Sequence, residues 1–236
     1  MPGFEVAVII PARNEEAALA GVLGEIPQEV RKTVIVVDNG STDRTGEVAG
    51  RAGASVVREP RAGYGYACAA GVRAAAERQA DILVFLDGDG SFDATEIATV
   101  LAPIEAGRAE LVLGSRPAGG MERGAMPAHA RFGNWLVARI MGLLYGLQVT
   151  DLGPFRAIRA ETLIRLEMKE MTYGWPTEMT VKAARLGLPI VEVPVRYRAR
   201  RGGRSKVSGT VRGTFLATFH ILSVTLRYAL GGKVDS

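Results

Sequence analysis

The first half of the chain alternates short apolar runs with segments of helix-forming composition. The apolar runs lack a helical period and predict strands at residues 6–10, 33–37, 54–57, 82–86 and 110–113. The segments between them predict helices at residues 17–26, 64–79 and 95–106, with a shorter helix that ends near residue 52. This alternation is typical of an α/β fold with a mainly parallel central sheet and helices on both faces.

The second half begins with a loop at residues 117–127 that is rich in Gly, Met and Pro. A strand-like segment at 148–158 contains a Gly-Pro break, and it is followed by a predicted helix at 173–187 and a strand at 189–197. Residues 129–146 predict a long helix, and we expect Trp135 of this helix in the core. Its apolar side is formed by Phe132, Trp135, Leu136, Ile140, Leu143 and Leu144.

A basic arm at residues 198–206 and a helix at 210–230 end the chain. We see no strong domain boundary, so we interpret residues 1–197 as one domain to which residues 198–236 are appended. The final helix either packs on the sheet of that domain or lies on a membrane surface beside the cationic arm. Its amphipathic stripe comprises Val211, Phe215, Phe219, Leu222 and Leu226.

Composition and charge narrow the class of protein. The chain has 236 residues, of which 47% are hydrophobic and 23% charged, as in a soluble globular protein. The formal net charge of +4 is too small to indicate a nucleic-acid partner. Cys68, the one cysteine, excludes an internal disulfide framework and fits a reducing compartment. No apolar run is long enough to predict a transmembrane helix, and the N-terminus lacks the basic region of a signal peptide.

Two carboxylates directly follow the predicted strand at 82–86, in the sequence Asp87-Gly88-Asp89. Ligands of open α/β sheets bind at the carboxyl ends of the strands. Carboxylate oxygens there suit a hard divalent cation, Mg²⁺ or Mn²⁺, which in turn holds phosphates. An ordinary solvated Asp-Gly turn is the alternative explanation. Asp38 and Arg116 also follow predicted strands, so we expect all these groups on one rim of the sheet.

Other short motifs accompany this pair along the chain. They are Pro-Ala-Arg-Asn-Glu at 11–15, Val-Asp-Asn-Gly-Ser-Thr-Asp at 37–43, Gly-Ser-Arg at 114–116, Asp-Leu-Gly-Pro-Phe-Arg at 151–156, and the arm with Arg200 and Lys206. Their order and spacing resemble those of family 2 glycosyltransferases of the GT-A fold, a Rossmann-like α/β domain. Within that family the chain is most similar to the branch of dolichyl-phosphate mannose synthase and related polyprenyl-phosphate sugar transferases.

The resemblance implies a donor site made by the N-terminal motifs. Asn39 replaces the usual second aspartate, and we choose Asp38 as the carboxylate that contacts the base or ribose. Asp87, Gly88 and Asp89 match the D-x-D motif, with Asp89 as the more direct metal ligand. Arg116 matches a phosphate-side motif. The base and ribose of a nucleotide-diphosphate sugar would also meet Pro11, Ala12, Arg13, Asn14 and Glu15. From its position, Asn14 could equally cap the helix that follows.

The resemblance also implies acceptor-side and catalytic groups. Asp151 and Arg156 match the acceptor motif, although Gly-Pro replaces its usual Ser-Gly. Glu178 takes the place of a carboxylate that many relatives follow with Asp; here Met follows, so a paired base is absent. In relatives, the positions of Arg200 and Lys206 clamp the donor pyrophosphate and the acceptor phosphate. Two aromatic residues before Glu178 line either a sugar pocket or a hydrophobic helix entrance: Tyr173 and Trp175.

These matches predict an inverting, metal-dependent hexosyltransferase that uses a GDP- or UDP-hexose. An acceptor phosphate is already anionic and needs no general base, so the missing second carboxylate favours a polyprenyl phosphate acceptor. Such an enzyme would be cytoplasmic and peripheral on the inner face of the cell membrane. The alternatives are a soluble acceptor with Glu178 as base, and a nucleotide-sugar-binding protein without turnover. A nucleotidyltransferase is disfavoured because residues 11–15 are not a Gly-rich basic loop. A homodimer stays open.

Overall fold

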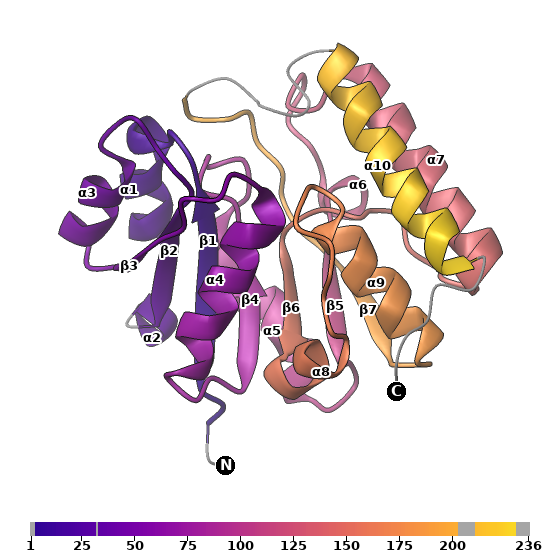
Figure 1. Ribbon diagram of the computed structural model, residues 1–236, viewed down its shortest axis with the longest axis horizontal. Coiled ribbons are helices and arrows are strands. Elements are labelled where there is room, and N and C mark those ends of the chain that lie inside the picture. Colours follow the sequence, from indigo (N-terminus) through magenta and orange to yellow (C-terminus); the bar gives the residue numbers. More distant parts are fainter. Residues whose placement is uncertain (1–2, 32, 203–210, 230–236) are drawn as a thin grey trace.

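A computed structural model describes residues 3–31, 33–202 and 211–229 (Figure 1). The strands are β1 (Val6–Ala12), β2 (Val34–Asp38), β3 (Ser55–Arg58), β4 (Ile82–Phe85), β5 (Leu111–Ser115), β6 (Arg156–Arg159) and β7 (Ile190–Pro194). The helices are α1 (Glu16–Glu25), α2 (Gln28–Arg31), α3 (Thr45–Arg51), α4 (Tyr64–Ala76), the 3-10 turn η1 (Ala94–Glu96), α5 (Ile97–Glu105), α6 (Arg116–Gly119), α7 (Ala128–Tyr145), α8 (Ala160–Arg165), α9 (Trp175–Arg185) and α10 (Val211–Ala229).

The strands form one sheet in the order β3-β2-β1-β4-β6-β5-β7. Every pairing among them is parallel except those of β6, which runs antiparallel to both β4 and β5. The prediction of an α/β fold with a mainly parallel sheet is therefore confirmed. Because β1, β2 and β4 are parallel neighbours, the loops that follow them meet at one edge of the sheet.

Strand β1 shows how the two faces of the sheet are filled. Val8 and Ile10 point to the face covered by α1, α3 and α5, whereas Ala7 and Ile9 point to the face covered by α4, α8 and α9. This alternation is the period of a strand buried on both faces. Helix α4 approaches closely because Gly71 lies over Ile9, where an added Cβ would be 2.3 Å from a side-chain carbon.

Helices α7 and α10 lie side by side and form a layer outside α9 (Figure 1). They enclose a small core of their own with α9: Val137, Met141, Val181, Val224 and Tyr228. A hydrogen bond from the Tyr145 hydroxyl to the Thr225 carbonyl also joins the two helices.

The prediction of which side of the helix at 129–146 is buried was wrong. Helix α7 buries the face of Gly133, Val137, Ala138 and Met141 instead. Trp135, which we expected in the core, is 55% exposed. Small residues let α10 pack closely, and the larger apolar side chains are left outside. They are Phe132, Trp135, Leu143 and Leu144.

Several local predictions also differ from the structure. The strand-like segment 148–158 yields only the short strand β6, and α8 directly after it was not predicted. Asn14 does not cap α1: it has a φ of 52°, and its amide oxygen accepts a hydrogen bond from the Thr42 amide. Asp43, by contrast, does accept a hydrogen bond from the amide of Thr45 at the start of α3. Among the described helices, none is both long and apolar enough to span a bilayer.

Candidate active site

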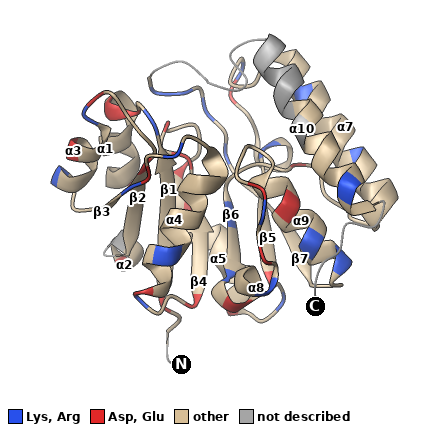
Figure 2. Cartoon of the chain, in the orientation of Figure 1, with Lys and Arg blue, Asp and Glu red and all other residues tan. Residues whose placement is uncertain are grey.

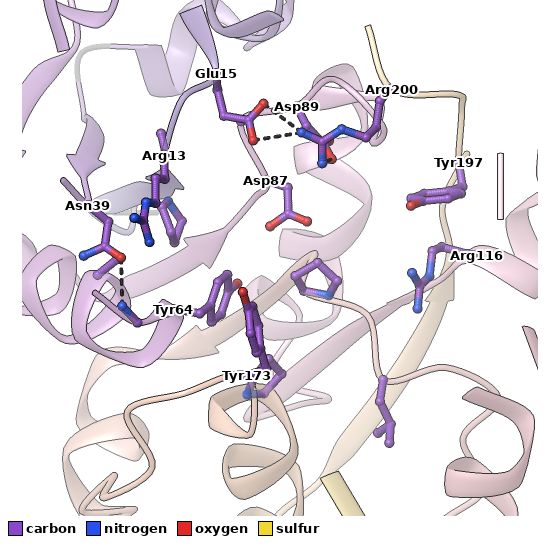
Figure 3. Close-up of a pocket in the computed structure, with 18 of the residues that line it drawn as sticks. Arg13, Glu15, Asn39, Tyr64, Asp87, Asp89, Arg116, Tyr173, Tyr197 and Arg200 are labelled. Atoms are coloured by element: carbon purple, nitrogen blue, oxygen red, sulfur yellow. Dashed lines mark hydrogen bonds and ion pairs between the residues drawn. The ribbon is translucent and has the colours of Figure 1, made fainter. Parts of the chain in front are cut away.

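A cavity of about 350 Å³ opens at the carboxyl ends of the parallel strands. This volume lies in the range of small-molecule sites. Its wall brings together most of the residues expected to hold a nucleotide sugar, and Figure 3 shows Asp87 near its centre. These residues are Pro11, Ala12, Arg13, Glu15, Asp87, Gly88, Asp89, Arg116 and Arg200.

The two carboxylates after β4 have different surroundings. The oxygen Oδ1 of Asp89 accepts hydrogen bonds from the Ser91 amide at 2.8 Å and from its hydroxyl at 2.6 Å, which fix its orientation. Within the described part of the chain, no hydrogen bond reaches the Asp87 carboxylate, which points into the cavity (Figure 3). Burial raises the pKa of Asp87, and the negative charge of Asp89 raises it further. A cation placed here would relieve that repulsion.

Arg200 joins two acidic residues at the cavity wall. Its Nη1 lies 2.7 Å from Oδ2 of Asp89, and its Nη2 lies 2.9 Å from both carboxylate oxygens of Glu15 (Figure 3). Burial disfavours the charge on Arg200, but the two carboxylates outweigh it and raise its pKa. The guanidinium therefore stays charged and neutralises part of the acidic cluster.

The backbone of the arm is fixed to the same loop. The amide of Arg201 donates to the Asp89 carbonyl at 3.1 Å, and the amide of Arg198 donates to the Ser91 carbonyl at 2.7 Å. The Arg198 side chain also pairs with Glu25, 3.2 Å away. The start of the basic arm thus lies along the loop that carries Asp87 and Asp89, as the motif suggested for Arg200. Lys206 lies outside the described residues.

The loop after β2 contributes a residue that we did not choose. Asn39 lines the cavity, and its amide donates to the carbonyls of Glu59 and Arg61 and accepts from the Gly63 amide. Asp38 is not among the lining residues; its carboxylate accepts the Ser41 amide at 2.9 Å. Asn39 therefore shapes this part of the cavity by holding the loop at 59–63.

Arg116 and Asp151 form a buried pair beside the cavity. The guanidinium binds the carboxylate through two nitrogens, each at 2.6 Å, and the Arg116 amide binds it at 2.9 Å. Burial lowers the pKa of Arg116, but Asp151 more than compensates, so the pKa is raised. Asp151 is fully buried and positions Arg116, which lines the cavity beneath the ring of Tyr197. Asp151 is not among the residues that line the cavity, so the structure does not support its expected direct contact with an acceptor.

Arg156 has a comparable supporting position. Its side chain is 1% exposed, and it donates to the carbonyls of Leu152, Gly153 and Pro176. Burial lowers the pKa of Arg156 to about 10, which still leaves it charged at neutral pH. Arg156 is not among the lining residues, but it holds two segments that are: the loop at 152–154 and the start of α9.

The structure places Glu178, which we expected as a catalytic group, away from the cavity. Its carboxylate is fully buried, pairs with Lys182 at 3.0 Å and accepts the hydroxyl of Tyr228 at 2.6 Å. It also accepts the backbone amides of Lys169 and Glu170. A carboxylate with these partners fastens α9 to α10 and to the preceding loop, and it is not among the lining residues.

Trp175 is a second correction on the acceptor side. It is 3% exposed and packs in the core beneath α9, whereas Tyr173 lines the cavity. The other residues that complete this wall were not singled out from the sequence. They are Leu152, Pro154, Pro176, Tyr197 and Ile221. The motif at 151–156 pointed to the region of the first two, but nothing in the sequence indicated Ile221 of α10.

Comparisons with known proteins identify the family of the chain. A family model described as "Glycosyl transferase family 2" matches residues 7–166. The chain belongs to this family. It is 42% identical to an uncharacterised glycosyltransferase of Mycobacterium tuberculosis, over 92% of this chain and 96% of that one. It is 35% identical to an undecaprenyl-phosphate mannosyltransferase of Micrococcus luteus, over 89% of this chain and 90% of that one.

A solved structure resembles the whole fold. It is glucosyl-3-phosphoglycerate synthase of Mycobacterium tuberculosis, in complex with Mn²⁺, UDP-glucose and phosphoglyceric acid. The TM-score is 0.76 at 26% sequence identity, and the match covers 99% of this chain and 82% of that one. This protein is therefore a GT-A-fold glycosyltransferase, as the motifs predicted.

Proposed function

We propose that this enzyme moves a hexose from a nucleotide-diphosphate sugar to a polyprenyl phosphate, with inversion at the anomeric carbon. One observation carries the proposal: one cavity is lined both by charged groups and by apolar side chains. The charged groups include Asp87, Asp89 and Arg200. The apolar side chains include Leu152, Pro154, Pro176 and Ile221. The first set suits a diphosphate and the second suits the start of a lipid chain.

The proposed position of the donor in the cavity is taken from the resemblance to the solved synthase. The similar synthase was solved with UDP-glucose. In this chain the corresponding base and ribose would lie against residues 11–13 and Asn39, and Arg116 and Arg200 would face the diphosphate. Both guanidiniums are charged, so each stabilises negative charge where the leaving diphosphate develops it. A UDP-hexose and a GDP-hexose both fit this chemistry.

Asp87 and Asp89 suit a divalent cation. The similar synthase contains Mn²⁺, and the unbonded carboxylate of Asp87 offers oxygen ligands for Mn²⁺ or Mg²⁺. Among the described residues, no group of three His, Cys, Asp or Glu side chains could hold a metal by itself. Donor phosphate oxygens would complete the coordination. When bound, the cation supplies Lewis-acid stabilisation of the leaving diphosphate.

The distribution of carboxylates favours a phosphate acceptor. Among the described residues, those that line the cavity include three carboxylates: Glu15, Asp87 and Asp89. Glu15 and Asp89 are paired with Arg200, and Asp87 is assigned to the cation. With Glu178 buried elsewhere, the described lining leaves no further carboxylate to deprotonate a hydroxyl. An acceptor phosphate brings its own negative charge and attacks without a base.

A soluble acceptor is the second candidate. It is favoured by the likeness to the synthase solved with phosphoglyceric acid, while the lipid acceptor is favoured by the undecaprenyl-phosphate mannosyltransferase. The proposal places the protein at the cytoplasmic face of the cell membrane, where a nucleotide sugar and a lipid phosphate meet. Residues 1–197 are proposed as the transferase domain and 198–236 as its appended arm and helix.

A transfer assay tests the proposal. Purified protein, Mn²⁺ or Mg²⁺, labelled UDP- and GDP-hexoses and short polyprenyl phosphates in detergent are incubated together. Label in the organic phase, dependent on the lipid phosphate, is the expected result. Label in a water-soluble product with phosphoglyceric acid, and none in lipid, would overturn the lipid acceptor. Donor binding without any product would instead indicate a binding protein.

A further inference from the structure

Helix α7 exposes a stripe of large apolar side chains. Phe132, Trp135 and Leu143 are 61%, 55% and 82% exposed, and Arg139 is exposed between them. Their spacings of three and four residues place these four side chains on one side of the helix. The rings of Phe132 and Trp135 lie 5.7 Å apart and form a small aromatic surface. Large apolar side chains grouped on an exposed helix face make this face a candidate interaction site.

Helix α10, which packs beside α7, also exposes large apolar side chains. Phe219 and Leu226 of α10 are also exposed, while Val224 and Tyr228 are buried against α7 and α9. The buried hydrogen bond from Tyr228 to Glu178 fixes the rotation of α10 on the domain. The exposed side chains are therefore a stable feature of the packed helix. We call the exposed apolar residues of the two helices the α7–α10 surface: Phe132, Trp135, Leu143, Leu144, Phe219 and Leu226.

The charges on these helices have one sign. Neither α7 nor α10 contains an Asp or a Glu, and Figure 2 shows basic but no acidic residues along both. Arg131, Arg139 and Arg227 are exposed. Arg131 and Arg139 form no ion pair with any side chain in the described part of the chain. Aromatic and leucine side chains beside unpaired arginines are typical of helices that lie in the interface of an anionic bilayer.

We propose that the α7–α10 surface docks the protein on a bilayer that carries anionic headgroups. A second copy of the chain fits less well. A two-fold contact through this surface would bring the arginines of both copies together without a carboxylate to balance them. The docking also places the reaction centre beside the lipid, because Ile221 of α10 lines the cavity. The inference rests on the proposed function only for the identity of the lipid acceptor, not for the binding.

Vesicle sedimentation tests the docking. The full chain is mixed with phosphatidylcholine vesicles, with or without phosphatidylglycerol, at low and high salt. We expect binding that requires phosphatidylglycerol and weakens with salt. The double variant Phe132→Ser/Trp135→Ser should bind about a hundred-fold more weakly, since each large apolar side chain in the interface contributes about ten-fold. Arg139→Glu should weaken binding to the anionic vesicles and reduce its dependence on salt.

Ile164→Ser is the matched control. Ile164 is 68% exposed on α8, so its substitution removes a comparable apolar side chain outside the α7–α10 surface and should leave vesicle binding unchanged. Wild-type protein that does not bind, or a double variant that binds equally well, would overturn the docking. A dimer that dissociates in Phe132→Ser/Trp135→Ser, without vesicle binding, would identify a second copy as the occupant.

An assay in detergent separates this inference from the proposed function. With a detergent-solubilised polyprenyl phosphate, docking is not needed, so Phe132→Ser/Trp135→Ser should transfer sugar as fast as wild type. If wild type makes no lipid product in detergent but binds vesicles, the acceptor proposal fails and the docking stands. If wild type makes lipid product in detergent but does not bind vesicles, the docking proposal fails and the acceptor proposal stands.

Discussion

The rim at the carboxyl ends of the strands and the α7–α10 surface differ in how their charged residues are balanced. Opposite charges are paired at the rim, whereas the only charged residues on the two helices are basic. At the rim, acidic and basic groups from distant segments neutralise one another, as Glu15 and Asp89 do with Arg200. On α7 and α10, arginines stand among exposed apolar side chains without any acidic residue. Under our two proposals, this difference corresponds to two tasks: the rim receives and balances phosphate charge, and the helices meet an extended lipid surface.

The largest expected effect comes from breaking the rim. Asp89→Ala removes a proposed cation ligand and one partner of Arg200, so transfer should fall by about a hundred-fold or more. The fold should persist, since Glu15 still pairs with Arg200. Transfer rate and thermal unfolding are measured together. Glu105→Ala, at an exposed site on α5, is the control and should change neither. Most activity retained by Asp89→Ala would remove the cation role from this residue.

Glu178 offers a second way to separate a structural from a catalytic carboxylate. Glu178→Gln leaves Lys182 in the core without its charged partner, so the free energy of unfolding should fall by about 3 kcal/mol or more. At low temperature, where the variant is still folded, transfer should stay close to wild type. Denaturant unfolding and transfer rates check both parts.

The double variant Glu178→Met/Lys182→Met tests the same pair from the other side. Replacing both charges by apolar groups of similar volume removes the uncompensated charge, but it leaves the Tyr228 hydroxyl and the amides of Lys169 and Glu170 without their acceptor, so the double variant should remain less stable than wild type. A variant Glu178→Gln with wild-type stability and no transfer would show instead that the carboxylate takes part in the chemistry.

The rim could be predicted from the sequence because topology places it. Once parallel strands are recognised, residues that follow them must meet at one edge, and Asp87, Asp89 and Arg116 do so. Motif position alone was less reliable for single side chains. Asp38 and Asn39 are neighbours, yet only Asn39 faces the cavity, because hydrogen bonds to the loop at 59–63 fix its amide.

The α7–α10 surface could not be predicted in the same way. Hydrophobic periodicity identified helices in both segments, but it does not state what covers an apolar face. In α7 the small residues Gly133 and Ala138 pack against neighbouring helices and the larger Trp135 stays outside. The surroundings of Glu178 could not be predicted either, because its partner Tyr228 lies on α10 and becomes a neighbour only when the helices pack together.

A smaller effect is expected from removing Arg200. Its guanidinium and a cation compete for the same Asp89 carboxylate, so Arg200→Ala should bind Mn²⁺ about five-fold more tightly without donor, corresponding to about 1 kcal/mol. Transfer should nevertheless be slower, because the positive charge facing the diphosphate is lost. Electron paramagnetic resonance of free Mn²⁺ measures the affinity. Arg201→Ala, which removes a partner of Glu25, is the control. Equal or weaker Mn²⁺ binding by Arg200→Ala would contradict the competition.

The smallest expected effect tests which face of α7 supports the fold. Trp135→Ser should change the free energy of unfolding by no more than about 0.5 kcal/mol, because the indole is largely in solvent. Val137→Ser, two residues later but 2% exposed, should cost about 2 kcal/mol or more, since it leaves a cavity and buries a hydroxyl. Chemical denaturation of the two variants measures the contrast. Equal losses would mean that the aromatic stripe is covered in the folded chain, and it would then not be available to any bilayer.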